Sequence, residues 1–321
     1  MHKNHRIYFK YNKMITVNNL KKTYGNVEAL KGINLSISQG EFYGLLGPNG
    51  AGKSTTISIM STILKADAGN VQIDNMELGT NAQACKKIIG VVPQEIALYS
   101  KLSAYENLLF WGNLYNVESS VLKDRIDQTL HMMGLYDRRN DIIKNYSGGM
   151  KRRINIASAL LHTPKILFMD EPTVGIDPQS RNLIFEVVEK LHKDGMTIVY
   201  TTHYMEEAER FCNRVGIIDN GQIVAEGSLQ DLRTSSGIKE NILIRYASIS
   251  KEQIEKFSER MQAVINQEEK TIQYPTTALK SDLPKIIIAC SDLGLEITQI
   301  DIQKVSLETI FLKLTGKQLR D

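Results

Sequence analysis

The eight residues 47–54, Gly-Pro-Asn-Gly-Ala-Gly-Lys-Ser, most constrain the fold of this chain, because they match the phosphate-binding pattern G-x-x-x-x-G-K-[ST]. The apolar run 41–46 before them predicts a buried strand, and the segment from 53 to about 64 has apolar residues at helical spacing. Glycines let backbone N–H groups close around phosphate oxygens, and a helix N-terminus adds partial positive charge. The flanking strand and helix favour a nucleotide site over a chance glycine-rich turn.

Two side chains of this loop have predicted contacts with a nucleotide. Lys53 is expected to reach the β- and γ-phosphates, and the Ser54 hydroxyl to bind Mg²⁺.

A second strong element is the stretch 166–171, Ile-Leu-Phe-Met-Asp-Glu. Its four apolar residues predict a buried parallel strand, and ligands bind at the carboxyl ends of such strands. Asp170 is therefore expected to hold Mg²⁺ through water, and Glu171 to orient and deprotonate an attacking water molecule. A single Asp after an apolar run is weak, whereas Asp-Glu in a chain with a phosphate-binding loop is much stronger.

Three further residues carry weaker signals. Gln94 follows a predicted strand at 89–92 and can reach a metal ion or water, although most such glutamines are solvated. His203 follows a predicted strand at 197–201, where it can contact a γ-phosphate. Tyr24 lies in a predicted turn and could stack on a base, but a lone Tyr in a turn is usually a surface residue.

A second Gly-containing segment, Ser147-Gly148-Gly149, precedes a predicted basic helix at 151–162. A Ser-Gly-Gly at a helix start is an anion site of the same physical kind as the first loop. The tripeptide is common in linkers, so its position at a helix start is what gives it weight.

Composition sets wide bounds. The chain has 321 residues, 42% hydrophobic and 23% charged, which is ordinary for a globular protein. Its net charge of +3 is too small to indicate nucleic-acid binding. The three scattered cysteines argue against a disulfide framework, and no apolar run approaches the ~18 residues of a membrane span, so a membrane role would come through a partner chain.

The pattern along the chain changes at three places. Residues 1–13 are basic and aromatic and are interpreted as an upstream extension before a natural start at Met14, a genuine basic tail being the alternative. Strand patterns give way to amphipathic helices between about 96 and 145, and a strand–helix pattern restarts after a linker near Ser236. The predicted domains are an N-terminal extension 1–13, a nucleotide-binding domain 14–235 with a helical part at about 96–145, and an accessory domain 236–321.

Together these motifs resemble the ATP-binding subunit of an ATP-binding cassette (ABC) transporter, from Ile15 to about Leu232. The resemblance implies an α/β fold: a P-loop NTPase sheet with helices on both faces, an N-terminal antiparallel β subdomain, a helical subdomain, and a small C-terminal α+β domain. It implies ATP and Mg²⁺ as cofactors, and Ser54, Gln94 and Asp170 as metal ligands. It assigns catalytic roles to Glu171, His203 and Gln94, and nucleotide contacts to Tyr24, Gly47, Pro48, Asn49, Gly50, Ala51, Gly52, Lys53, Ser54, Thr55, Ser147, Gly148, Gly149 and Asp177.

The signature segment departs from the family's usual Leu-Ser-Gly-Gly-Gln, because Tyr146 replaces Leu and Met150 replaces Gln. The phosphate-facing Ser and both glycines remain, so binding is expected to survive. The tail 305–316 resembles the accessory domain of the drug- and antibiotic-export branch.

The resemblance implies a head-to-tail pair of cassettes, homodimeric or with a paired cassette. Each ATP would lie between one chain's phosphate-binding loop and the other chain's Ser147–Gly149. Partners would be integral-membrane permease subunits, at the cytoplasmic face of the membrane, and no nucleic acid is expected.

Two other classes of protein are alternatives to a transport subunit. Cassettes that act on DNA carry long heptad coiled coils between the two glycine-containing motifs, and no sustained heptads occur here. Ribosome-acting cassettes usually come two to a chain. A non-catalytic regulatory subunit would be expected to lack Glu171 or His203, and both are present.

Overall fold

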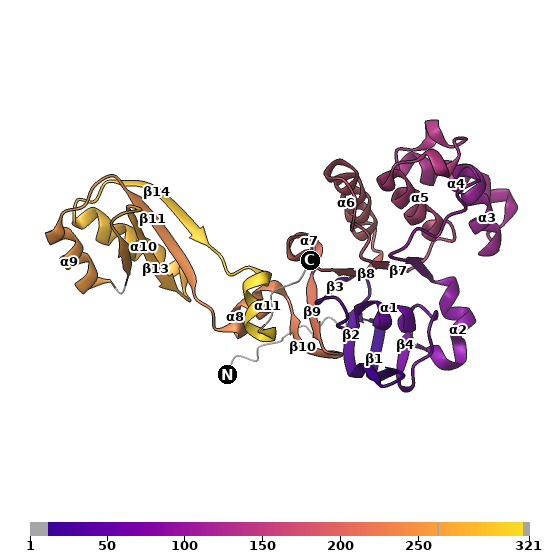
Figure 1. The fold of residues 1–321 in the computed structure, drawn as a ribbon, viewed down its shortest axis with the longest axis horizontal. Coiled ribbons are helices and arrows are strands. Elements are labelled where there is room, and N and C mark those ends of the chain that lie inside the picture. The colour runs from indigo at the N-terminus through magenta and orange to yellow at the C-terminus, as the bar shows by residue number, and fades with distance from the viewer. Residues whose placement is uncertain (1–11, 262, 317–321) are drawn as a thin grey trace, which may run out of the picture. The chain divides into compact units, whose positions relative to one another are not determined.

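The structure is a computed structural model that describes residues 12–261 and 263–316. It forms two compact units that divide between Leu229 and Gln230 (Figure 1). The elements of the first unit are β1 (Lys13–Tyr24), β2 (Val27–Ser38), β3 (Phe42–Leu46), α1 (Lys53–Met60), β4 (Ala68–Ile73), β5 (Met76–Glu77), α2 (Leu78–Lys87), β6 (Ile89–Val92), α3 (Ala104–Leu114), α4 (Ser119–Met132), η1 (Tyr136–Arg138), η2 (Ile143–Asn145), α5 (Gly148–Leu160), β7 (Ile166–Asp170), α6 (Pro178–Lys193), β8 (Thr197–Thr202), α7 (Met205–Phe211), β9 (Arg214–Asp219) and β10 (Gln222–Gly227).

The central sheet of this unit has the strand order β10-β9-β3-β8-β7-β6. All its neighbouring pairs are parallel except β10–β9, which is a hairpin. The strands β3, β7 and β8 are buried at every position, as expected for a sheet covered on both faces. The carboxyl ends of β3, β8, β7 and β6 therefore lie side by side along one edge.

Two different layers cover this sheet. On one face Tyr43 packs in a core that includes α1 and the antiparallel sheet β2-β1-β4-β5. On the other face the Phe42 ring lies 6.0 Å from that of Phe211 in α7 and 5.4 Å from that of His192 in α6. Figure 1 shows α1 and β1, β2 and β4 on one side of β3, and α6 and α7 on the other. The expected α/β fold with helices on both faces is confirmed.

The antiparallel sheet corrects one prediction. A turn was expected at 21–26, but β1 runs through Tyr24 and pairs with β2 up to the Tyr24–Val27 pair, so only Gly25 and Asn26 form the turn. Register shifts within the pairing, between Val17 and Leu20 among others, break the alternation of apolar residues that marks a strand. β1 also begins at Lys13, and the Asn12 carbonyl accepts a hydrogen bond from the Gln39 amide. The end of the predicted extension 1–13 is therefore part of the sheet. Its residues 1–11 lie outside the described residues.

The helices α3, α4 and α5 pack on one another, and the short helices η1 and η2 connect α4 to α5. α3 begins with a capping box, in which Ser103 accepts from the Glu106 amide and Glu106 accepts from the Ser103 amide. α5 begins at Gly148, three residues before the predicted start at Lys151, so the signature segment forms its first turn. The helical part thus includes the helix that carries this segment.

The second unit has the elements α8 (Leu229–Ser236), β11 (Glu240–Tyr246), α9 (Lys251–Arg260), β12 (Val264–Asn266), β13 (Thr271–Thr276), α10 (Leu279–Asp292), β14 (Ile297–Gln303) and α11 (Leu307–Thr315). From β11 to β14 the order is β-α-β-β-α-β, and the antiparallel sheet order is β12-β13-β11-β14, which is a ferredoxin-like arrangement. Helices α9 and α10 cover one face of this sheet, where Ile244, Phe257 and Ile286 are fully buried. The α+β character expected for the C-terminal domain is present.

The division between the units falls after the first residue of α8, whereas the sequence pattern predicts a domain boundary between 235 and 236. Leu232 of α8 is buried, and the Arg233 Nε donates to the Val305 carbonyl at 2.7 Å. The Lys313 Nζ donates to the Ser236 carbonyl at 2.6 Å. The residues that resemble a linker are therefore the last turn of α8, whose partners come from sequence about 70 residues later.

Candidate functional site

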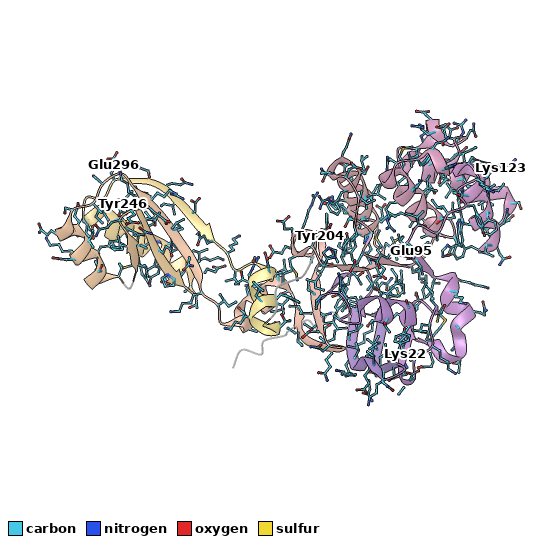
Figure 2. All side chains as sticks on the ribbon, in the orientation of Figure 1. Lys22, Glu95, Lys123, Tyr204, Tyr246 and Glu296 are labelled. Atoms are coloured by element: carbon cyan, nitrogen blue, oxygen red, sulfur yellow. The ribbon has the colours of Figure 1, made fainter. Side chains whose placement is uncertain are left out.

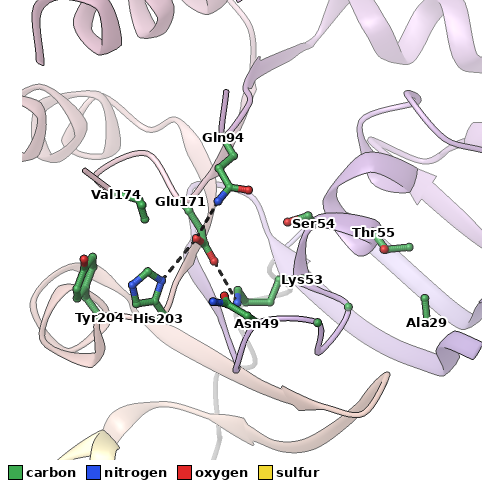
Figure 3. A pocket seen from close by; sticks show the side chains of 12 residues that line it. Ala29, Asn49, Lys53, Ser54, Thr55, Gln94, Glu171, Val174, His203 and Tyr204 are labelled. Carbon is green, nitrogen blue, oxygen red and sulfur yellow. Dashed lines mark hydrogen bonds and ion pairs between the residues drawn. The ribbon is translucent and has the colours of Figure 1, made fainter. Parts of the chain in front are cut away.

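One cavity of about 660 Å³ lies at the carboxyl ends of four neighbouring strands (Figure 3). Lys53 follows β3 after the phosphate-binding loop, His203 follows β8, Glu171 follows β7, and Gln94 is the second residue after β6. The lining residues are Ala29, Asn49, Gly50, Gly52, Lys53, Ser54, Thr55, Gln94, Glu171, Val174, His203 and Tyr204. The parallel sheet thus brings together predicted site residues from four separate stretches of sequence.

The phosphate-binding loop is built for close backbone approach. A Cβ on Gly47 would lie 2.2 Å from the Ile218 carbonyl oxygen, so only glycine fits there. Gly52 has φ 110°, a conformation that favours glycine, and caps α1 without a side-chain hydrogen bond. The first amides of α1 are therefore not capped by a side chain at the N-cap, which leaves them available to an anion.

Lys53 is held deep in the cavity. Its side chain is 4% exposed, and its Nζ donates to the carbonyl oxygens of Gly47 at 2.8 Å and Pro48 at 3.2 Å. The same Nζ lies 3.1 Å from the Glu171 Oε1. These contacts fix the ammonium group at the base of the loop, where it can meet phosphate oxygens.

Glu171 is the centre of the polar contacts. Besides Lys53, its carboxylate accepts a hydrogen bond from the Gln94 Nε2 at 3.3 Å, and its Oε2 lies 3.5 Å from the His203 Nδ1 (Figure 3). Its backbone has φ 45°, in the left-handed region that non-glycine residues rarely adopt. Such strain is common at functional sites, and here it occurs at the residue directly after β7.

Thr201 contacts both acidic residues of this edge, the carboxylate of Asp170 and the backbone amide of Glu171. Its Oγ1 donates to the Asp170 Oδ1 at 2.6 Å and accepts from the Glu171 amide at 2.9 Å. Asp170 is buried, so its orientation is fixed by this contact. Sequence reasoning missed Thr201, and only its position on the strand next to β7 could have indicated it.

The His203 Nδ1 is buried and faces the Glu171 Oε2 at 3.5 Å, but it forms no hydrogen bond in the described part of the chain. The imidazole ring lies 4.2 Å from the ring of Tyr204, which also lines the cavity. A buried polar atom without a partner at a cavity wall is suited to a ligand. Tyr204, Val174 and Ala29 are further lining residues that the sequence reasoning did not select.

The signature segment lies outside the cavity lining. Ser147 caps α5 by accepting from the Met150 amide at 3.2 Å, and Ser147 and Gly148 are exposed. Gly149 is buried, and a Cβ at this position would lie 2.1 Å from the Ser180 Oγ and 3.3 Å from the Asp177 Oδ2. The start of α5 therefore lies against the start of α6.

Asp177 caps α6 by accepting from the Ser180 amide at 2.9 Å, and this hydrogen bond lowers the pKa of its carboxyl group. The side chain is exposed and does not line the cavity.

Tyr146, which stands where the family pattern has Leu, is accommodated by its surroundings. The side chain is 4% exposed, and its hydroxyl donates to the Arg138 carbonyl at 2.6 Å. The substitution thus adds an anchor to η1 without changing the exposed Ser147.

Tyr24 lies apart from the cavity lining and is 49% exposed. The Lys22 Nζ lies 5.8 Å from its ring centroid, and Figure 2 shows Lys22 in the antiparallel sheet. Its predicted base contact stays a prediction.

Among the described residues, none of the helices has the length and apolar character needed to span a membrane. The family model for ABC transporters matches residues 30–174. The linearmycin resistance ATP-binding protein LnrL of Bacillus subtilis is 42% identical over 96% of this chain and 100% of its own length. The chain belongs to the ATP-binding subunits of ABC transporters. It binds and hydrolyses ATP, and the expected resemblance is confirmed.

Other relatives and solved structures agree with this assignment. The daunorubicin/doxorubicin resistance ATP-binding protein DrrA of Streptomyces peucetius is 33% identical over 96% of this chain and 94% of its own length. The Nod factor export ATP-binding protein I of Cupriavidus pinatubonensis is 32% identical over 96% and 92%. A dimeric cassette structure in a post-hydrolysis state with ADP and Pi covers 67% of this chain and 99% of its own, with 31% identity and a TM-score of 0.62. The drug-exporter branch expected from the tail is confirmed.

Proposed function

We propose that this chain powers the export of an antibiotic-like or lipid-like compound through a separate permease. The observation that carries the proposal is the cavity in which Glu171 contacts Lys53 and Gln94 and lies beside His203. The relatives whose names mention linearmycin, daunorubicin and Nod factor support export of this class of compound. Through the permease, the chain works at the cytoplasmic face of the membrane.

Within the cavity, each residue has a distinct task. Lys53 neutralises phosphate oxygens, and the Glu171 carboxylate orients and deprotonates the attacking water. His203 donates or accepts at the γ-phosphate through its imidazole ring, whose Nδ1 makes no hydrogen bond within the described residues and lies 3.5 Å from the Glu171 Oε2. The Lys53 contact with Glu171 must open when phosphate oxygens take its place, which frees Glu171 for the water.

The oxygen-bearing side chains at this edge suit Mg²⁺, which prefers hard oxygen ligands. The Ser54 hydroxyl and the Gln94 amide line the cavity, and Asp170 stands at the end of β7 with its carboxylate oriented by Thr201. Mg²⁺ would neutralise charge on the transferred phosphate and position it. Ser54, Gln94 and, through water, Asp170 are the residues that would hold it.

The Ser147–Gly149 segment, in which Ser147 and Gly148 are exposed, supports a composite site shared by two chains. It begins a helix, where backbone amides can bind an anion, yet it is absent from the lining of the cavity in its own chain. A two-fold pair of cassettes would use it on the partner's nucleotide, and repeat the contact twice. The similar dimeric cassettes support such a pair.

A second cavity, of about 490 Å³, supports a permease contact. It lies between the sheet core and the helical part, and Ile63, Trp111, Tyr115 and Asn155 are among its lining residues. Ile63 is 67% exposed, which is unusual for an apolar side chain beside a cavity. We propose that an apolar cytoplasmic loop of the permease fills it.

This second cavity is tied to the nucleotide site by two side chains of α5. The Asn155 Oδ1 accepts from the Ala97 amide at 3.3 Å, and the Arg152 guanidinium donates to the carbonyls of Pro93 and Gln94. Because Gln94 contacts Glu171, a shift of α5 on permease contact would move a residue of the ATP site.

A mixing experiment tests the composite site. Chains with Lys53→Ala and chains with Ser147→Arg are each expected to have little ATPase activity, because each kind of dimer has two damaged sites. In their mixed dimer both lesions fall in one site, and the other site is built from intact halves. ATPase rate, measured with the permease present as the ratio of the two chains is varied, should rise above the average of the separate variants.

Wild-type chains mixed with chains that carry both substitutions provide the control, because each such mixed dimer has one lesion in each site. Activity of the first mixture, together with inactivity of the mixed dimers in the control, supports action of Ser147 in the partner's site. Mixing that yields only the average of two inactive proteins would show that both loops serve a site within one chain.

A further inference from the structure

The carboxylate of Glu207 in α7 is a buried group outside the nucleotide contacts. The residue is 4% exposed and does not line the nucleotide cavity. The Thr173 Oγ1 donates to its Oε1 at 2.7 Å. The Tyr200 hydroxyl and the Thr202 Oγ1 donate to its Oε2 at 2.9 and 2.8 Å. Burial of a carboxylate is unfavourable unless hydrogen bonds replace its water contacts, so these three hydroxyl groups fix the position of Glu207.

Two of these hydroxyl groups belong to the turns that carry site residues. Thr173 is the second residue after Glu171, in the segment between β7 and α6. Thr202 is the last residue of β8 and directly precedes His203. The two turns bind different oxygens of one carboxylate. Glu207 therefore joins the segment after β7 to the segment after β8.

The turn of His203 is closed by hydrogen bonds that end on Glu207. The Tyr204 amide donates to the Thr202 Oγ1 at 2.9 Å, and the same hydroxyl donates to Glu207. The Glu207 amide donates to the Tyr204 carbonyl at 3.2 Å. Because His203 lies between Thr202 and Tyr204, these contacts set the direction in which its imidazole leaves the chain.

The Glu171 backbone needs support, because its φ of 45° lies in the left-handed region. Strained conformations persist only where the surrounding contacts determine them. On one side the Thr201 Oγ1 accepts from the Glu171 amide at 2.9 Å, and on the other side Thr173 is tied to Glu207. The Glu171 Oε2 lies 3.5 Å from the His203 Nδ1 (Figure 3). This separation depends on both turns, which meet at Glu207.

We propose that Glu207 is a positioning residue for ATP hydrolysis, whose carboxylate holds the turns of Glu171 and His203 at the separation that lets both side chains act on one γ-phosphate. Nucleotide binding depends on the loop 47–54, which none of these hydrogen bonds reaches. Loss of the Glu207 contacts should therefore lower kcat and leave nucleotide affinity unchanged. The inference rests on the proposed roles of Glu171 and His203.

Two identical substitutions at opposite ends of β8 test this effect in the full chain. Thr202→Val removes a donor to Glu207 and should lower kcat about tenfold, because small displacements of catalytic groups slow the reaction. Thr197→Val is the matched control, since Thr197 is fully buried at the first position of β8 and its Oγ1 accepts from the Gly40 amide at 2.8 Å. Both should lower the melting temperature, because each removes a hydroxyl that accepts from a backbone amide, but only Thr202→Val should lower kcat. Nucleotide affinity, titrated with a fluorescent ATP analogue, should keep its wild-type value in both.

Further variants test the other turn and the carboxylate itself. Thr173→Val should also lower kcat about tenfold, and Glu207→Leu, which releases both turns, about 100-fold. Glu207→Gln is the conservative variant. Hydroxyl groups can accept as well as donate, so its carboxamide can keep both turns joined, and kcat should stay within about threefold of wild type. Addition of Thr173→Val to Glu207→Leu should cause no further loss, because the threonine hydroxyl acts through the carboxylate.

Threonine variants of the two turns that lose no more kcat than Thr197→Val would overturn the proposal, and they decide it even if Glu207→Leu fails to fold. Equal losses in Glu207→Gln and Glu207→Leu would also contradict it, since the charge and not the hydrogen-bonded position would then matter. Glu171→Gln, assayed beside them, separates this inference from the proposed function. An inactive Glu171→Gln together with threonine variants of wild-type kcat refutes the role of Glu207 alone, whereas an active Glu171→Gln refutes the proposed role of Glu171.

Discussion

The Nζ of Lys53 lies 3.1 Å from the Oε1 of Glu171, and the two side chains are only 4% and 6% exposed. Removal of one member of a buried ion pair leaves an uncompensated charge, which is strongly unfavourable. The pair also means that phosphate oxygens compete with Glu171 for the same ammonium group. Substitutions of the two residues should therefore affect binding and turnover differently.

Lys53→Ala should weaken nucleotide binding about 10- to 100-fold, because a charge-assisted contact with phosphate contributes about 1.5–3 kcal/mol. The dissociation constant can be measured by titration with a fluorescent ATP analogue. Lys87→Ala, at an exposed lysine of α2, is the matched control and should bind as wild type. Equal affinities of the two variants would contradict the role of Lys53.

Glu171→Gln should retain nucleotide binding and lose at least about 100-fold in ATPase rate, because the group that accepts the proton of the attacking water is gone. The neutral amide also holds Lys53 less strongly, so affinity should be equal or higher. Binding and turnover are measured on the same preparation. A variant that hydrolyses ATP at the wild-type rate would exclude Glu171 as the base.

Arg152→Met tests the connection between α5 and Gln94. The Arg152 guanidinium donates to the carbonyls of Pro93 and Gln94, and burial lowers its pKa. Without it the Gln94 backbone loses its support, so kcat should fall about tenfold, consistent with a buried charged hydrogen bond, while nucleotide affinity changes little.

Arg153→Met is the matched control for this variant. Arg153 is a neighbouring buried arginine of α5, but it donates to the Met133 carbonyl in the helical part at 2.6 Å. Both substitutions should lower thermal stability, whereas only the first should lower kcat. Equal losses of kcat would indicate a purely structural role for Arg152.

The strands and the contiguous motifs could be predicted from the sequence because they depend on local pattern. The segments 47–54 and 166–171 combine apolar runs with fixed residue types, and the structure brings them to one cavity. The short helices α2 and α7 were missed because each is only two or three turns long and their apolar periodicity is weak.

Contacts between distant residues were the part that the sequence could not show. Thr201 accepts a hydrogen bond from the Glu171 amide on the adjacent strand. The end of α8 is hydrogen-bonded to Val305 and Lys313, which come many residues later in the sequence. The sequence pattern predicts a helix at 283–293, whereas α10 begins at Leu279 and has Pro284 inside it. No rule of local spacing contains these pairings.

Because of the buried Cys290 thiol, the free energy of unfolding should decrease at alkaline pH. This thiol is fully buried in the core of the second unit, and burial raises its pKa from 9.0 to about 11. Between these two values the unfolded chain releases the proton and the folded chain keeps it, so the free energy of unfolding falls as pH rises. The stabilising effect of the neutral thiol is complete below about pH 9 and disappears as pH passes about 11.

Cys290→Ala lacks this proton, although its smaller side chain should destabilise the unit at neutral pH. The difference in unfolding free energy between wild type and Cys290→Ala, measured by urea titration with reductant at pH 7.5, 9 and 10, should decline by up to about 1.4 kcal/mol per pH unit above 9. Cys85 and Cys212 are present in both proteins, so their ionisation cancels in the difference. A difference that stays constant across this range would show that the folded thiol ionises as readily as the unfolded one.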